Sequence, residues 1–142
     1  MNNDRSAVIV LVLRCFMGFA LFLPLGIDKI AAFPGWSAGI VESHRETILG
    51  IAPSLPLLYL FSYALPFLET LGGLALLVGW QTRRAFLVMA GLLVVLSFGT
   101  TLGGRVGTTA NNLVFLGACL WGYLLADADR YGLSAWRKSG NR

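Results

Sequence analysis

LLYLFSYALPFLETLGGLALLVGW, residues 57–80, is the stretch that decides the fold of this chain. A helix rises roughly 1.5 Å per residue and the hydrocarbon core of a bilayer is roughly 30 Å thick, so the stretch is long enough to cross a membrane. One carboxylate, Glu69, lies near its centre, where an ionisable side chain is costly and needs a partner. Pro66 lacks a backbone donor and clashes with the Ser62 carbonyl, so we expect a kink and another group that satisfies this carbonyl.

The composition of the whole chain is that of a membrane protein. Of its 142 residues, 56% are hydrophobic and only 13% are charged, and the mean hydropathy is +0.72. Soluble domains carry about 25% charged residues. The net charge of +4 comes from Lys and Arg residues that lie between apolar runs rather than in one patch, which indicates membrane topology and excludes a nucleic-acid-binding protein.

The cysteines and the single histidine argue against metal and haem sites. Cys15 and Cys119 each lie inside an apolar run and form no C-x-x-C pair, which is typical of small buried residues and disfavours a thiol-exchange enzyme. His44 is the only histidine, so the chain cannot supply two axial histidines to a haem. We therefore expect no metal and no haem in this chain.

Apolar runs predict four spans, over residues 7–25, 57–80, 85–102 and 108–126. Their short connections predict a single all-α domain, a transmembrane antiparallel four-helix bundle. Pro24 and Gly26 are expected to loosen the end of the first span, so that Lys29 meets water. Residues 127–142 are expected to form an ordinary polar tail.

Residues 36–49 predict a short interfacial helix between the first two spans. Trp36, Ile40 and His44 share one face of this helix, whereas Glu42 and Arg45 take the other, as in a helix that lies on the bilayer or on the mouth of the bundle. Ser37 is a candidate to cap its N-terminus.

The distribution of positive charge predicts the orientation. Seven Lys and Arg residues fall on the side of the two termini and three fall on the other side, which favours cytoplasmic termini in a bacterial-type inner membrane. Polar residues would then gather at the outer mouth of the bundle: Lys29, Trp36, His44, Arg105, Asn111 and Asn112. Alternatively, His44 is a partly buried interfacial histidine, and the two asparagines cap or bond between helices.

Arg14 is the cation that we expect to pair with Glu69. Depths taken from the helical rise place Arg14 about 10 Å and Glu69 about 16 Å from the inner edge, a gap that an arginine side chain can bridge. A structural interpretation is that this pair only locks two helices together. A functional interpretation is a site for a quinone headgroup, with an apolar slot, donors for the carbonyl oxygens and a carboxylate that carries protons, formed by Arg14, Glu69 and Ser62.

Four segments resemble the DoxX/DoxD-like family of small four-helix membrane proteins. They are LRCFMGFALF, LGIDKI, ETLGGLALLVGWQTRRA and GACLWGYLLADADRYGLS, and together they extend over nearly the whole chain. The resemblance implies a role beside membrane redox enzymes, and by position it implies a polar core of Arg14, Lys29 and Glu69. Relatives include a subunit of thiosulfate:quinone oxidoreductase, although this chain lacks the paired cysteines of a thiol relay.

The leading hypothesis is therefore a quinone-linked membrane subunit of a redox complex. Its expected partners are the lipid bilayer and a larger redox protein that supplies the electron carrier, and a second copy of the chain is a further alternative. The rival hypothesis is a non-catalytic anchor or assembly subunit of a larger membrane enzyme. A small-solute carrier is disfavoured, because the chain has neither an inverted repeat nor two broken helices.

Overall fold

The computed structural model describes residues 3–44 and 55–139, and over those residues the protein is all-α. Within them, four helices are long and apolar enough to cross a membrane: Asp4–Ala31, Pro56–Val78, Thr82–Leu102 and Val106–Trp136. The all-α class is thus confirmed, and the number of long apolar helices agrees with the four predicted spans. The elements in order are α1 Asn3–Cys15, η1 Phe16–Phe22, α2 Leu23–Ala31, α3 Gly35–His44, α4 Leu55–Val78, α5 Thr82–Leu102, α6 Val106–Leu125, η2 Ala126–Ala128 and α7 Leu133–Ser139.

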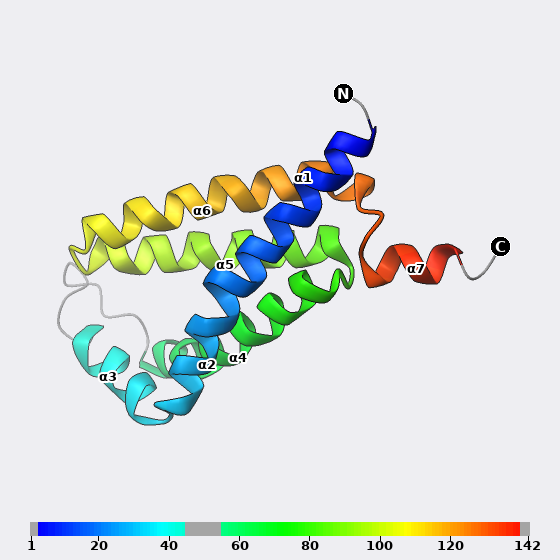
Figure 1. Ribbon diagram of the computed structural model, residues 1–142. Coiled ribbons are helices and arrows are strands. Elements are labelled where there is room, and N and C mark those ends of the chain that lie inside the picture. Colours follow the sequence, from blue (N-terminus) through cyan, green and yellow to red (C-terminus); the bar gives the residue numbers. More distant parts are fainter. Residues whose placement is uncertain (1–2, 45–54, 140–142) are drawn as a thin grey trace.

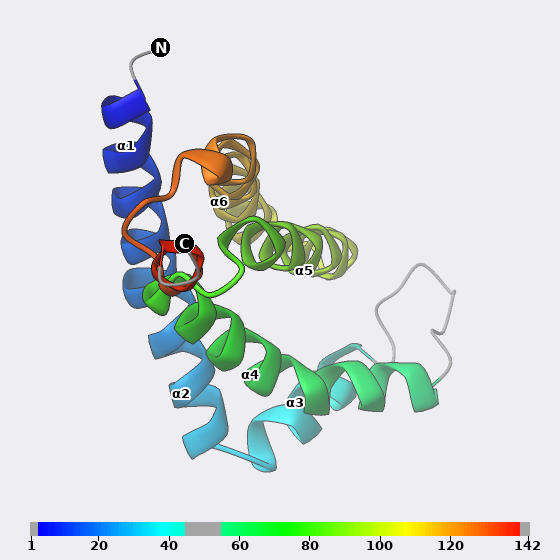
Figure 2. The same cartoon turned by 90° about the vertical axis from the view of Figure 1, so that its right-hand side faces the viewer.

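The spans pack as one close pair and one crossing pair. Helices α5 and α6 run antiparallel side by side, while the long helix formed by α1, η1 and α2 crosses them obliquely and packs on α4 (Figures 1 and 2). Both chain ends and the α4–α5 turn lie at one end of the molecule, which we call the terminal end; α3 and the α5–α6 turn lie at the other, the α3 end (Figure 1).

The first span continues through Pro24 and ends only at Ala31, six residues beyond its predicted end. The reason is the π-helical segment η1, in which the Leu23 N–H donates to the Gly18 carbonyl. Pro24 lies just after this π-helical segment, in the first turn of α2. The extra turns carry Lys29 along the bundle instead of releasing it into water.

Close backbone contact joins the first span to α4. A Cβ added at Gly18 would lie 2.7 Å from the Gly73 carbonyl oxygen, and a Cβ added at Gly26 would lie 2.7 Å from the Thr70 backbone nitrogen. Small residues at such crossings let helices in lipid approach until their backbones touch. Gly26 lies one turn before Lys29, and Thr70 is adjacent to Glu69, so this crossing brings the two charged residues together.

The Ser62 carbonyl, which Pro66 deprives of its helical donor, has the partner that the sequence requires. Pro66 lies inside the helix, and the Ser62 carbonyl accepts a hydrogen bond of 2.9 Å from the Ser37 hydroxyl, with both serines fully buried. The prediction that Ser37 caps α3 was wrong: α3 begins at Gly35, and the serine points across to α4 because it and Val41 form the buried side of α3. Residues 45–49 of the predicted interfacial helix lie outside the described residues.

Replacing Ser37 with alanine should destabilise the protein by about 1–3 kcal/mol, because it leaves the buried Ser62 carbonyl without a partner. Ser97→Ala is the matched control, since among the described residues the Ser97 hydroxyl bonds to the Leu93 carbonyl of its own helix, which keeps its backbone partner. Equilibrium unfolding in detergent with increasing dodecyl sulfate measures both. Equal losses of stability in the two variants would contradict the claim that Ser37 stabilises α4 by donating to the Ser62 carbonyl.

Candidate functional site

A lysine and a glutamate form an ion pair between the first span and α4. The Lys29 ammonium contacts both carboxylate oxygens of Glu69, at 2.7 and 2.5 Å. The Glu69 side chain is 2% exposed and that of Lys29 is 17% exposed. The Glu69 side chain is therefore sealed in the protein, whereas the Lys29 side chain is partly exposed at its surface. Such a pair holds both charges at a depth where either alone would be costly.

Trp36 of α3 completes the surroundings of the ammonium. The Lys29 Nζ atom lies 4.9 Å from the centre of the Trp36 ring, a cation–π contact. Trp36 reaches this position because Ser37, the next residue, fixes α3 to α4 at the Ser62 carbonyl. Ser62 lies one turn before Pro66, and its own hydroxyl donates to the Tyr59 carbonyl at 3.1 Å. The site thus contains Lys29, Glu69 and Trp36, with Ser62 as part of its support.

Aromatic rings continue from this site along α4. Phe33 makes edge-to-face contacts with Tyr63 and Phe67, with ring centres 5.2 and 5.9 Å apart. Tyr59 lies one turn before Tyr63, and their ring centres are 6.3 Å apart. All four side chains are exposed at the surface of the described structure. A flat ring or a lipid chain could approach the ion pair along this aromatic surface.

The predicted pairing of Arg14 with Glu69 was wrong. The Arg14 guanidinium lies against Gly79, ten residues after Glu69 and therefore roughly 15 Å further along α4. The depths were calculated as if the first span and α4 ran along one common axis, whereas the first span crosses α4 obliquely (Figure 2). In addition, side chains lean toward the N-terminus of their helix, so Arg14 reaches toward the terminal end, and Lys29 reaches back along its span toward Glu69.

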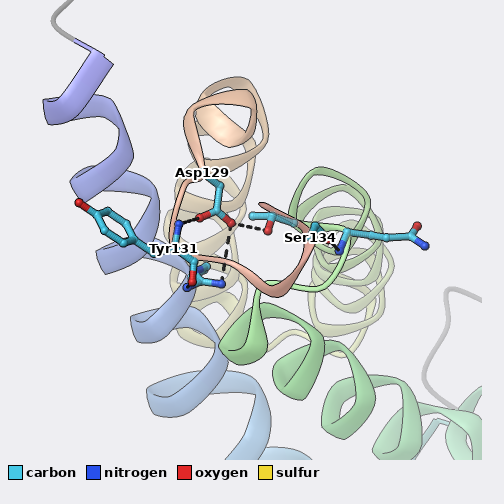
Figure 3. A network of polar contacts seen from close by, with 6 residues as sticks. Asp129, Tyr131 and Ser134 are labelled. Carbon is cyan, nitrogen blue, oxygen red and sulfur yellow. Dashed lines mark hydrogen bonds and ion pairs between the residues drawn. The ribbon is translucent and has the colours of Figure 1, made fainter. Parts of the chain in front are cut away.

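Arg14 belongs to a second polar cluster, at the terminal end. Its Nη2 donates to the Tyr131 carbonyl at 3.0 Å, and its Nη1 lies 3.8 Å from the Asp129 carboxylate. Asp129 also accepts a hydrogen bond of 2.6 Å from the Thr82 hydroxyl. Figure 3 shows Asp129, Tyr131 and Ser134 arranged around this point. Both charged side chains are at most 5% exposed, so this ion pair is nearly as buried as the Glu69 side chain.

The C-terminal segment is consequently not an ordinary polar tail. Ser134 accepts a hydrogen bond of 2.7 Å from the Gln81 N–H and donates its own backbone N–H to the Gly79 carbonyl at 3.2 Å. We call residues 129–134, with these bonds, the C-terminal clip. Sequence reasoning missed it, although an aspartate followed within five residues by glycine and serine was a signal for a turn that could meet Arg14.

The other residues that were predicted at the outer mouth make no described contact with Lys29 or Trp36. Arg105 precedes α6, and Asn111 and Asn112 lie in its first two turns, on the helix that packs against α5. Arg105 and Asn111 are exposed and Asn112 is half-buried. The prediction for His44, the last residue of α3, concerns a side chain outside the described part of the structure.

A comparison with protein-family models finds a match that extends from the first span to the end of α5. The DoxX family model matches residues 9–102, which include Arg14, Lys29, Trp36 and Glu69. No curated protein and no solved structure matches the chain. Among the described residues, no group of three or more His, Cys, Asp or Glu side chains could hold a metal ion.

Proposed function

This chain belongs to the DoxX family, and from that premise we propose that it is a multi-pass membrane subunit that binds a quinone headgroup beside Lys29 and Glu69. The observation that carries the proposal is the asymmetric burial of the pair, with a sealed Glu69 side chain behind a partly exposed Lys29 side chain. In this proposal, a partner protein of a redox complex would supply the electrons.

The residues present suit a quinone. The Lys29 ammonium has three N–H donors, of which two face Glu69, and among the described residues the third has no oxygen partner. It could donate to a quinone carbonyl, while Trp36 and the exposed rings of α4 offer apolar surface to the ring and tail. Glu69 could hold a proton close to that carbonyl. A bound quinone supplies the capacity to take up two electrons and two protons.

A binding titration tests this proposal. In lipid nanodiscs, a short-chain quinone should quench Trp36 fluorescence saturably, and Lys29→Gln should weaken binding by about tenfold or more, the loss expected for a hydrogen bond to a charged group. Asp127→Asn is the control, because its exposed carboxylate pairs with Arg83 at the terminal end. Saturable binding of equal affinity in the wild type and Lys29→Gln would contradict the assignment of the site.

A second candidate function is that of a non-catalytic anchor or assembly subunit. The observation in its favour is that Lys29 already contacts both oxygens of Glu69, as in a pair whose only role is to fasten two helices. Under this alternative, Glu69→Gln lowers the yield of the assembled complex and leaves the turnover of each complex unchanged. Under the quinone proposal, turnover also falls.

We further propose that both termini are cytoplasmic and that the membrane is a bacterial-type inner membrane. The segments of the terminal end carry seven Lys and Arg residues against three Asp, whereas those of the α3 end carry three of each sign. Reporter fusions at residue 142 and within residues 45–54 should therefore place the C-terminus in the cytoplasm and residues 45–54 on the opposite side of the membrane. Reporter activities that place them the other way round would overturn the proposed orientation.

A further inference from the structure

Helix α7 projects from the bundle at the terminal end on a rigid mount (Figure 1). The mount is the C-terminal clip, in which Asp129, Tyr131 and Ser134 bond to Thr82, Arg14 and Gln81. Gly132 strengthens it, since a Cβ added there would lie 2.8 Å from the Gly79 carbonyl oxygen. The Arg14 and Asp129 side chains that anchor the clip are at most 5% exposed, and the clip is bonded to both the first span and the α4–α5 turn, so α7 has a fixed place relative to the bundle.

The aromatic residues carried by this mount face outward. Trp136 is 79% exposed, and Tyr131 and Leu133 are exposed as well. Trp80, which follows α4, and Trp121, near the end of α6, are exposed at the same end of the bundle. Tryptophan and tyrosine prefer the level of the lipid headgroups, where an apolar ring and a polar edge are both accommodated. Together these side chains mark the level of the headgroups at the terminal end.

Charge selects the kind of lipid surface. In the sequence, Arg137 and Lys138 follow Trp136 directly, and Arg130 precedes α7. Arg83 and Arg84 are exposed in the first turn of α5, beside the clip. The excess of cations over aspartates at this end is complementary to anionic phospholipid, and each basic residue near such a surface contributes roughly a fivefold preference.

We propose that α7 docks on anionic phospholipid headgroups, with Trp136 inserted among them, and that the C-terminal clip exists to hold it there. The occupant is a lipid surface rather than a protein, because a seven-residue helix that carries Trp136 and Leu133 next to a basic pair matches a headgroup layer in both polarity and charge. The docking is independent of the quinone site, which lies toward the α3 end.

Fluorescence of Trp136 in nanodiscs tests the proposal with the full chain. The variant Trp80→Phe/Trp121→Phe is compared with the same variant carrying Trp136→Phe, so that the difference between the two isolates the emission of Trp136. Each protein is placed in phosphatidylcholine with a minority of brominated phosphatidylglycerol, or with the same fraction of brominated phosphatidylcholine. We expect quenching in both and roughly fivefold stronger quenching by the anionic lipid, falling as salt is raised.

Two results would overturn the proposal. Equal quenching by the two brominated lipids would show that charge plays no part. Trp136 emission typical of a water-exposed tryptophan, quenched by dissolved iodide and not by either lipid, would place Trp136 away from the bilayer. A protein partner would then be the occupant of this face. Hydrogen exchange of residues 133–139 in the unmodified protein, slower in anionic than in neutral nanodiscs, should agree with the fluorescence.

Discussion

Lys29→Met should destabilise the protein by about 3–5 kcal/mol, the cost of removing one partner of a buried ion pair. The variant leaves the Glu69 carboxylate, 2% exposed, without its only described ion-pair partner. Glu69→Gln should cost less, about 1–2 kcal/mol, because the amide can still accept a hydrogen bond and the partly exposed Lys29 can extend toward the membrane surface. Unfolding in detergent with increasing dodecyl sulfate gives both values.

Two further variants show whether the larger loss of stability in Lys29→Met than in Glu69→Gln comes from the unpaired Glu69 carboxylate. Lys29→Met/Glu69→Met should recover much of the stability lost in Lys29→Met, since a buried pair replaced by apolar residues is often neutral. Arg84→Met, which removes an exposed cation bonded to Gln81, should leave the free energy of unfolding unchanged within error. A larger loss of unfolding free energy in Glu69→Gln than in Lys29→Met would contradict the assignment of Glu69 as the more deeply buried partner.

Gly79→Ala should release the C-terminal clip. Gly79 has a φ of +67°, and a Cβ there would overlap the Arg14 guanidinium and the Gly132 backbone. The overlap involves backbone atoms, so the segment that carries Asp129 and Ser134 must move away. Hydrogen exchange across residues 129–134 should accelerate at least tenfold, which corresponds to about 1.4 kcal/mol of lost local stability.

Gly104→Ala is a matched control for this second prediction. Gly104 has nearly the same φ, +69°, but a Cβ there would meet no atom within 4 Å. It therefore reports the strain of a left-handed backbone alone, about 1–2 kcal/mol, without any displacement of the clip. Accelerated exchange at residues 129–134 in both variants would show that the contact with Arg14 and Gly132 is not what holds the segment.

Local features of the fold could be predicted from the sequence because they depend on length and on backbone chemistry. Apolar runs gave the four spans, and the missing N–H of Pro66 required a donor for the Ser62 carbonyl, which the structure supplies from Ser37. The cost of burying Glu69 required a cation, and one is present. Each of these inferences depends only on the chemistry of one segment, that is, on its length, its free carbonyl or its buried charge.

The choice of partners could not be predicted, because it depends on how the spans cross. Arg14 was predicted to pair with Glu69 and Lys29 to meet water, whereas the oblique crossing at Gly18 and Gly26 brings Lys29 to Glu69. The π-helical segment that carries the first span past Pro24 has no clear sequence signature. Asp129 lies 115 positions from Arg14 in the chain, so nothing local connects them.

A double-mutant cycle in unfolding free energy is the most direct test of the central claim, that Glu69 is paired with Lys29 inside the bundle. The cycle compares Lys29→Met and Glu69→Met singly and together, and a parallel cycle replaces Lys29→Met with Arg14→Met. We predict a coupling energy of more than about 1 kcal/mol between Lys29 and Glu69 and additive effects for Arg14 and Glu69. Additivity in the first cycle with strong coupling in the second would contradict the account.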